Sequence, residues 1–250
     1  MNKFTPLLLA AVLVSGCVST GDQPRKADPQ AARDAFIALG IGFLQEGETE
    51  RAKKPLADAL AIDPRSAQAN MVLALVFQQE GEYKTAEKHY RQALSSDPNN
   101  SRLLNNYGAF LLQQQRYPEA LTQFQKAAED NMYGERSRVF ENLGLTYRQM
   151  GDNENARSHF ERALRLNSRQ PQALLELARI EFEAQNYVPA WNYYLGFTQQ
   201  APQDASTLWL GYRMAKRFED HSRAASYALQ LRRLYPASQE AAALRDAEGQ

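Results

Sequence analysis

The chain has 250 residues, 44% of them hydrophobic and 23% charged, a composition that fits a folded globular protein and excludes disorder over most of its length. Its 29 basic and 29 acidic residues balance, so no overall field would attract nucleic acid, and we expect no nucleic acid partner. The single cysteine, Cys17, excludes an intramolecular disulfide and a metal site built from cysteines.

The first residues have the pattern of an export signal. Lys3 gives a basic start, an apolar stretch follows over 6–14, and small residues directly precede Cys17. The apolar stretch is too short for a permanent membrane-spanning helix. This order resembles the signal of bacterial lipoproteins. The resemblance implies that residues 1–16 are removed and that Cys17 becomes the acylated, membrane-anchored first residue of the mature chain; the alternative is an ordinary buried or free cysteine.

The segment after Cys17 is polar, contains Pro24 and Pro29, and lacks apolar periodicity. It is therefore predicted to be a flexible tether over residues 17–32. No aspartate follows Cys17 directly, where it would resemble an inner-membrane retention signal. The lipoprotein resemblance therefore implies the outer membrane, with the chain lipid-anchored and facing the periplasm.

An internal repeat extends over the remainder of the chain. Its clearest marker is an alanine followed four residues later by a large apolar residue, with successive gaps of 34, 34, 36, 34 and 34 residues. The alanines are Ala52, Ala86, Ala120, Ala156, Ala190 and Ala224. Their partners are Leu56, Tyr90, Phe124, Phe160, Tyr194 and, more weakly, Ala228.

A matching half-pattern precedes each alanine, as in Phe36, Leu39, Gly40 and Phe43, which lie at helical spacing. Gly47 and its equivalents stand at the end of the first helix, where glycine suits a left-handed cap. The whole pattern resembles the tetratricopeptide repeat. The resemblance implies an all-α, right-handed superhelix with a concave groove. The predicted repeats are 33–66, 67–100, 101–136, 137–170, 171–204 and 205–238, followed by a short capping helix over 239–250.

Two departures from the pattern carry structural expectations. The 36-residue gap places a two-residue insertion near 130–135, so the junction between the third and fourth repeats should be irregular. The sixth repeat is degenerate, because Ala228 stands where the other repeats have a large residue. Terminal repeats are expected to be atypical, since one side faces water.

The sequence offers no pattern of catalytic chemistry. His89, His159 and His221 are isolated from one another, so we expect structural or solvated histidines and no metal site. No glycine-rich phosphate loop follows a strand, and no carboxylate pair for acid–base work can be chosen. We therefore expect neither an enzyme nor a cofactor nor a small-molecule substrate.

The first helix of each tetratricopeptide repeat lines the groove, and its lining positions change in character along the chain. The first two repeats supply the apolar residues Ile37, Ile41, Leu44, Met71 and Leu75, which we predict to bind a partner protein. Alternatively, Ile37 and Ile41 are covered and belong to the core. Later repeats supply mainly basic residues, which favour a solvated face over a clamp for acidic peptides; they include Arg102, Arg138, Arg148, Arg179, Arg213, Lys216 and Arg217.

Segments between the repeat signatures resemble type IV pilus biogenesis lipoproteins of the PilF/PilW type. These segments are 103–111, 116–120, 133–145, 187–190, 218–220, 224–227 and 234–236. The resemblance implies a pilotin, which binds the secretin subunits of the type IV pilus and promotes their localisation and multimerisation at the outer membrane. The alternative is an adaptor lipoprotein for another envelope machine, such as cell-wall synthesis or cytochrome maturation.

Overall fold

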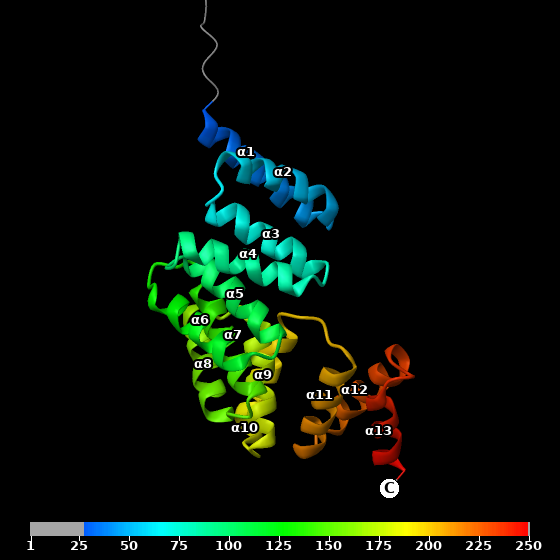
Figure 1. Ribbon diagram of the computed structural model, residues 1–250. Helices are drawn as coiled ribbons and strands as arrows, with labels where there is room; N and C mark the ends of the chain where they lie inside the picture. Colours follow the sequence, from blue (N-terminus) through cyan, green and yellow to red (C-terminus); the bar gives the residue numbers. More distant parts are fainter. Residues whose placement is uncertain (1–27, 250) are drawn as a thin grey trace, which may run out of the picture.

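The computed structural model describes residues 28–249, and this part of the chain folds into thirteen α-helices with no strand. The helices form six consecutive antiparallel hairpins that stack along the chain, followed by a final single helix (Figure 1). The predicted all-α repeat fold is confirmed. The helices are α1 Pro29–Gln45, α2 Thr49–Ile62, α3 Ala67–Gln79, α4 Tyr83–Ser96, α5 Ser101–Gln113, α6 Tyr117–Glu129, α7 Arg136–Gln149, α8 Asn153–Leu166, α9 Pro171–Glu183, α10 Tyr187–Thr198, α11 Ala205–Arg217, α12 His221–Leu234 and α13 Gln239–Glu248.

The first helix starts earlier than the tether prediction allows. The Asp28 side chain accepts a hydrogen bond from the backbone N–H of Gln30, and Pro29 is the first helical residue. Asp28 suits the position just before a helix and Pro29 suits the first helical position. The sequence analysis, by contrast, used Pro29 only as an indication of a loop. Residues 29–32 therefore belong to α1, and the predicted tether is wrong over them. The signal peptide, Cys17 and the rest of the tether lie outside the described residues.

The turn inside each hairpin uses one left-handed residue at an equivalent position. Gly47, Gly81 and Gly151 have φ angles of 78°, 77° and 80°, as expected for glycine caps. The other three hairpins keep the same geometry with non-glycine residues, Gln115, Gln185 and Glu219, at φ angles of 59°, 62° and 56°. Residues with a side chain rarely adopt the left-handed backbone conformation, so these three turns carry local strain that the stacking around them offsets.

Each hairpin closes by a match of small and large residues. A Cβ on Gly108 would lie 2.7 Å from the Phe124 ring, and one on Gly144 would lie 2.6 Å from the Phe160 ring. The sixth hairpin reverses this order, with Tyr212 at the small position and Ala228 at the large one. Tyr212 and Ala228 are both buried in the cluster of that hairpin. A Cβ on Gly211 would lie 3.0 Å from the Tyr227 ring, so this hairpin keeps a small–large contact that is displaced by one residue.

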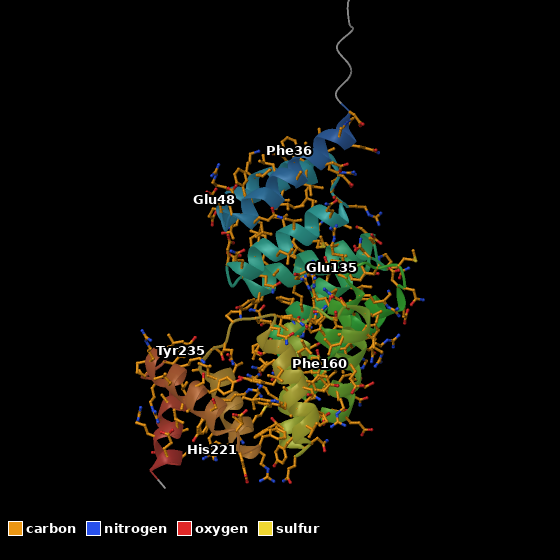
Figure 2. All side chains as sticks on the ribbon, turned by 180° about the vertical axis from the view of Figure 1, so that it is seen from behind. Phe36, Glu48, Glu135, Phe160, His221 and Tyr235 are labelled. Carbon is orange, nitrogen blue, oxygen red and sulfur yellow. The ribbon has the colours of Figure 1, made fainter. Side chains whose placement is uncertain are left out.

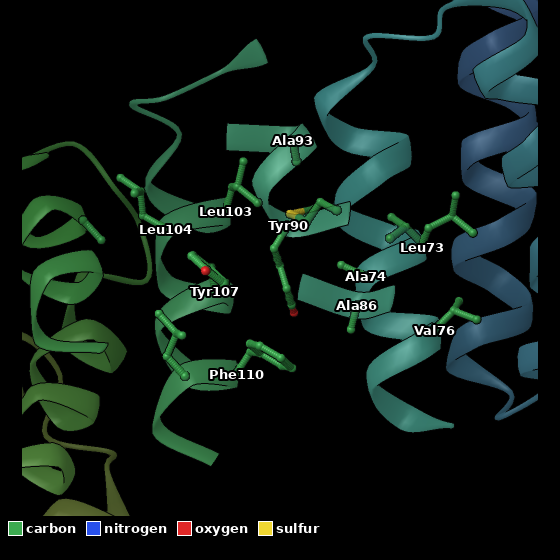
Figure 3. Packing of buried hydrophobic residues seen from close by; sticks show 14 of the residues in the cluster. Leu73, Ala74, Val76, Ala86, Tyr90, Ala93, Leu103, Leu104, Tyr107 and Phe110 are labelled. Carbon is green, nitrogen blue, oxygen red and sulfur yellow. The ribbon is translucent and has the colours of Figure 1, made fainter. Parts of the chain in front are cut away.

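Aromatic side chains fill the space between successive hairpins. Figure 3 shows Tyr90 extending from α4 toward Tyr107 and Phe110 of α5. The Tyr90 ring centroid lies 5.3 Å from that of Tyr107 and 5.4 Å from that of Phe110. The Tyr90 hydroxyl donates to Oε1 of Gln78 at 2.9 Å, so this buried phenol has its polar end satisfied.

The junction between α6 and α7 is irregular, as predicted from the 36-residue gap. Residues 130–135 connect the helices, and Asp130 holds the loop by accepting from the Ser101 hydroxyl at 2.7 Å and from the Met132 N–H at 2.9 Å. A second connection of equal length, 199–204, was not predicted. It arises because α10 ends early, at Thr198, and leaves the 34-residue period unchanged.

The 199–204 connection is fixed from both sides. The Tyr194 hydroxyl donates to the carbonyl oxygen of Thr207 at 2.8 Å. The hydroxyl of Tyr235, which follows α12 near this loop (Figure 2), donates to the carbonyl oxygen of Gln203 at 3.1 Å. The last hairpin and α13 therefore remain attached to the stack in a defined position.

None of the helices between residues 28 and 249 has the length and apolar character needed to cross a membrane.

Candidate binding groove

The five residues predicted to bind a partner are divided by the structure into two sets. Ile37 and Met71 border a cavity of about 340 Å³ at the first turns of α1 and α3. Leu44 and Leu75 border a separate cavity of about 410 Å³ near the last turns of the same helices. Ile41 is partly buried against the core and borders neither cavity.

The cavity at the first turns presents charges more than apolar surface. Ile37 and Met71 are only 2% and 6% exposed, because each packs in the core that the stacked hairpins share. Arg33 occupies the rim, with ion pairs to Asp34 at 2.7 Å and to Asp63 at 3.2 Å. For Ile37 this is the arrangement of the core alternative, and Met71, for which no such alternative was considered, is buried in the same way; the contact of both residues with a partner stays a prediction.

The second cavity combines apolar surface with amides held in place, and we call it the glutamine cavity. It is lined by Leu44, Leu75, Gln78, Gln79, Tyr83 and Gln113, from three successive hairpins. Nε2 of Gln78 donates to Oε1 of Gln113 at 2.7 Å, while Oε1 of Gln78 accepts from the Tyr90 hydroxyl. The leucine side chains can pack against an apolar peptide segment, and the oriented amides can hydrogen-bond to its backbone.

The middle of the groove is basic in sequence but ion-paired in structure. Nη1 of Arg179 lies 2.7 Å from Glu176, and Arg148 reaches Glu176 at 3.6 Å and Glu183 at 2.5 Å. Arg179 also donates to the Ser206 hydroxyl at 3.1 Å, which extends the network to α11. These arginines connect α7, α9 and α11, so they serve as links between hairpins and not as free cations.

The acidic partners in this network are residues that sequence analysis missed. Glu176 is 6% exposed and lies on the first helix of the fifth hairpin, one position from the apolar stripe. A buried carboxylate requires a cationic or hydrogen-bonding partner. A glutamate next to the apolar stripe of a repeat helix was the sequence signal from which such a pair could have been predicted. Asn105 is similarly engaged, since its Oδ1 accepts from Nδ2 of Asn142 at 2.9 Å.

The histidines are placed by aromatic packing. His159 stacks between Phe140 and Tyr147, with ring centroids 6.0 Å and 5.3 Å away, and burial lowers its pKa. His89 stacks on Phe77 at 5.4 Å, and burial lowers its pKa also. Across residues 28–249, no three His, Cys, Asp or Glu side chains converge in a way that could hold a metal ion.

Six stacked hairpins with a 34-residue period and an open groove define the chain as a tetratricopeptide repeat protein. A tetratricopeptide repeat family model matches residues 37–101 and 142–205, and a second such model matches residues 100–169. The type IV pilus assembly protein PilF of Pseudomonas aeruginosa is 53% identical over 237 residues, which are 94% of each chain. The chain therefore belongs to the PilF family of type IV pilus assembly proteins.

Solved structures agree with this assignment. That of Pseudomonas aeruginosa PilF matches with a TM-score of 0.86 and 52% identity, over 88% of this chain and 99% of that one. The structure of PilW, described as a widely conserved type IV pilus biogenesis factor, matches with a TM-score of 0.75 and 28% identity. That match covers 83% of this chain and 96% of the PilW chain.

Proposed function

We propose that this chain is an outer-membrane lipoprotein pilotin that faces the periplasm. In this proposal Cys17 carries the lipid, and the glutamine cavity binds subunits of the type IV pilus secretin. The lipid then holds these subunits at the outer membrane, where they multimerise. Membership in a family of pilus assembly proteins supports this function over the alternative adaptor for cell-wall synthesis or cytochrome maturation.

The glutamine cavity is the observation that carries the binding part of the proposal. Leu44 and Leu75 border it with partly buried side chains, and Gln78 presents an amide that Tyr90 and Gln113 orient. A pre-oriented site loses less entropy on binding than a flexible one. Anchoring to the same membrane also raises the local concentration of both partners, so modest affinity suffices.

The binding test uses Leu44→Asp and Leu75→Asp, each introduced alone into the full-length chain. A charge in the cavity opposes burial of an apolar partner segment, so we expect loss of secretin multimers from the outer-membrane fraction and loss of surface pili. The matched control is Leu229→Asp, because Leu229 on α12 is 63% exposed and far along the chain from the cavity. Normal multimers in both cavity variants, with their folding verified by circular dichroism, would refute the assignment.

The anchoring test is independent of the cavity. Cys17→Ser removes the acceptor for the lipid, so we expect the protein in the soluble periplasmic fraction and the secretin away from the outer membrane. A variant that stays in the membrane fraction would show that another feature anchors the chain.

A further inference from the structure

Two arginines near the C-terminal end of the groove are stacked on aromatic rings. Cζ of Arg213 lies 4.6 Å from the ring centroid of Phe182, and Cζ of Arg217 lies 4.5 Å from that of Tyr187. The two rings also contact each other edge to face, with centroids 5.5 Å apart. Stacking fixes the plane of a guanidinium group and leaves its N–H edge free to bind a carboxylate.

These side chains line a trough formed by α9 and α11 together with Tyr187, the first residue of α10. A cavity of about 370 Å³ is lined by Phe182, Tyr187, Trp209, Tyr212, Arg213, Lys216 and Arg217, and Ala247 of α13 closes one side. An adjoining cavity of about 180 Å³ shares Phe182, Trp209 and Arg213 with it. We call the two together the aromatic trough; its length and apolar floor suit a linear segment of a protein chain.

The cations of the aromatic trough are available for a ligand. Arg213, Lys216 and Arg217 are exposed, and none of them makes an ion pair with any residue in the described range 28–249. Two carboxylates on neighbouring elements are engaged elsewhere: Glu183 pairs with Arg148, and Glu248 pairs with Arg232. The trough is therefore a concave, positively charged site, unlike the ion-paired middle of the groove.

We propose that the aromatic trough binds an acidic segment of a partner protein. Carboxylates of the segment meet Arg213 and Arg217, and an apolar side chain between them occupies the cavity beside Trp209. The complementary charges supply orientation and attraction, and burial against the rings supplies contact area. The site is distinct from the glutamine cavity, so it does not depend on the identity of the partner bound there.

The first experiment selects binders from a displayed library of random peptides on the full-length chain. The Arg213→Gln/Arg217→Gln double variant serves for counter-selection. We expect the retained peptides to be enriched in Asp and Glu next to aromatic or aliphatic residues. A selection that retains no peptides, or retains peptides without acidic enrichment, would overturn the proposal.

The second experiment measures affinity for a selected peptide. The double variant should bind at least about tenfold more weakly, since two charge-assisted contacts are removed. Affinity for the unaltered chain should also fall as salt is raised. The control variant is Arg233→Gln, because Arg233 on α12 is likewise exposed and makes no ion pair with the described residues. Equal loss in the control, or no loss in the double variant, contradicts the proposal.

Fluorescence locates the bound peptide. Trp191 and Trp209 are the two tryptophans of the chain, so a Trp191→Phe background leaves Trp209 as a reporter within the trough. We expect its emission to shift on addition of the peptide, and an unchanged spectrum would place binding elsewhere. Vesicles of phosphatidylglycerol test the competing anionic ligand. Binding to vesicles that is lost in the double variant, without binding of peptides, would assign the trough to lipid and refute a protein partner.

Discussion

The first three hairpins and the last three present different working surfaces on the same scaffold. Near the N-terminus the glutamine cavity is neutral, with Leu44 and Leu75 beside glutamine amides. Near the C-terminus the groove is charged: Arg148 and Arg179 are ion-paired, while Arg213 and Arg217 are stacked on rings. A repeat architecture fixes where side chains lie and leaves their chemistry free to vary, so one groove can hold two unlike sites.

The largest expected effect concerns the two repeat positions of the sixth hairpin at which large and small residues are exchanged. Tyr212→Gly removes a buried aromatic side chain and should lower the free energy of unfolding by about 3 kcal/mol. Ala228→Phe alone should overpack the core and lower it by about 2 kcal/mol. Together they restore the order of the other hairpins, so the double variant should lose less than the sum. Urea unfolding measures all three, and additive losses would show that residues 212 and 228 do not pack against each other.

A smaller effect is expected from the ion-paired middle of the groove. Glu176→Gln leaves Arg148 and Arg179 without their shared buried carboxylate, and we expect a loss of about 2 kcal/mol in the free energy of unfolding. The matched control is Glu183→Gln. Its side chain is half exposed, so screening by water should make the change much smaller. Similar losses in the two variants would show that the network does not stabilise the stack through Glu176.

The strained turns give a gain in stability. Gln115→Gly and Gln185→Gly relieve a left-handed backbone at positions where three other hairpins already have glycine. Each should raise the free energy of unfolding by about 0.5–1 kcal/mol. The reverse change, Gly81→Ala, should lower it by about 1 kcal/mol. Thermal unfolding compares the three, and a destabilised Gln115→Gly chain would contradict the strain inferred from its φ angle.

The smallest expected effect is a pH dependence. Burial lowers the pKa of His159 below its ordinary value of 6.5, so between those two pKa values the unfolded chain binds the proton and the folded chain does not. The free energy of unfolding should therefore fall as pH decreases from 6.5 through the lowered pKa. His159→Phe, which keeps an aromatic ring between Phe140 and Tyr147, should reduce this slope in urea titrations. An unchanged slope in this variant would contradict the assignment to His159.

Sequence periodicity was sufficient for the hairpins, because each stripe and turn repeats within a single 34-residue unit. It did not predict the full ion pairing of Glu176, since one of its two partners, Arg148, comes from the preceding hairpin. For the same reason the burial of Ile37 and Ile41 remained open: it depends on the neighbouring helix and not on their own repeat. Stacking also holds Gln115 in a conformation that its residue type disfavours.

The contacts of Gly40, Gly108 and Gly144 with Leu56, Phe124 and Phe160 also constrain how such a chain can be rearranged. The third and fourth hairpins both place glycine on the first helix against phenylalanine on the second. Recombination could therefore exchange a helix of one hairpin for the equivalent helix of the other. A hybrid of α11 with α6 would place Tyr212 against Phe124, and one of α5 with α12 would leave a void at Gly108. In any such rearrangement α11 and α12 must therefore be moved together as one hairpin. This keeps the sixth hairpin at the end of the stack.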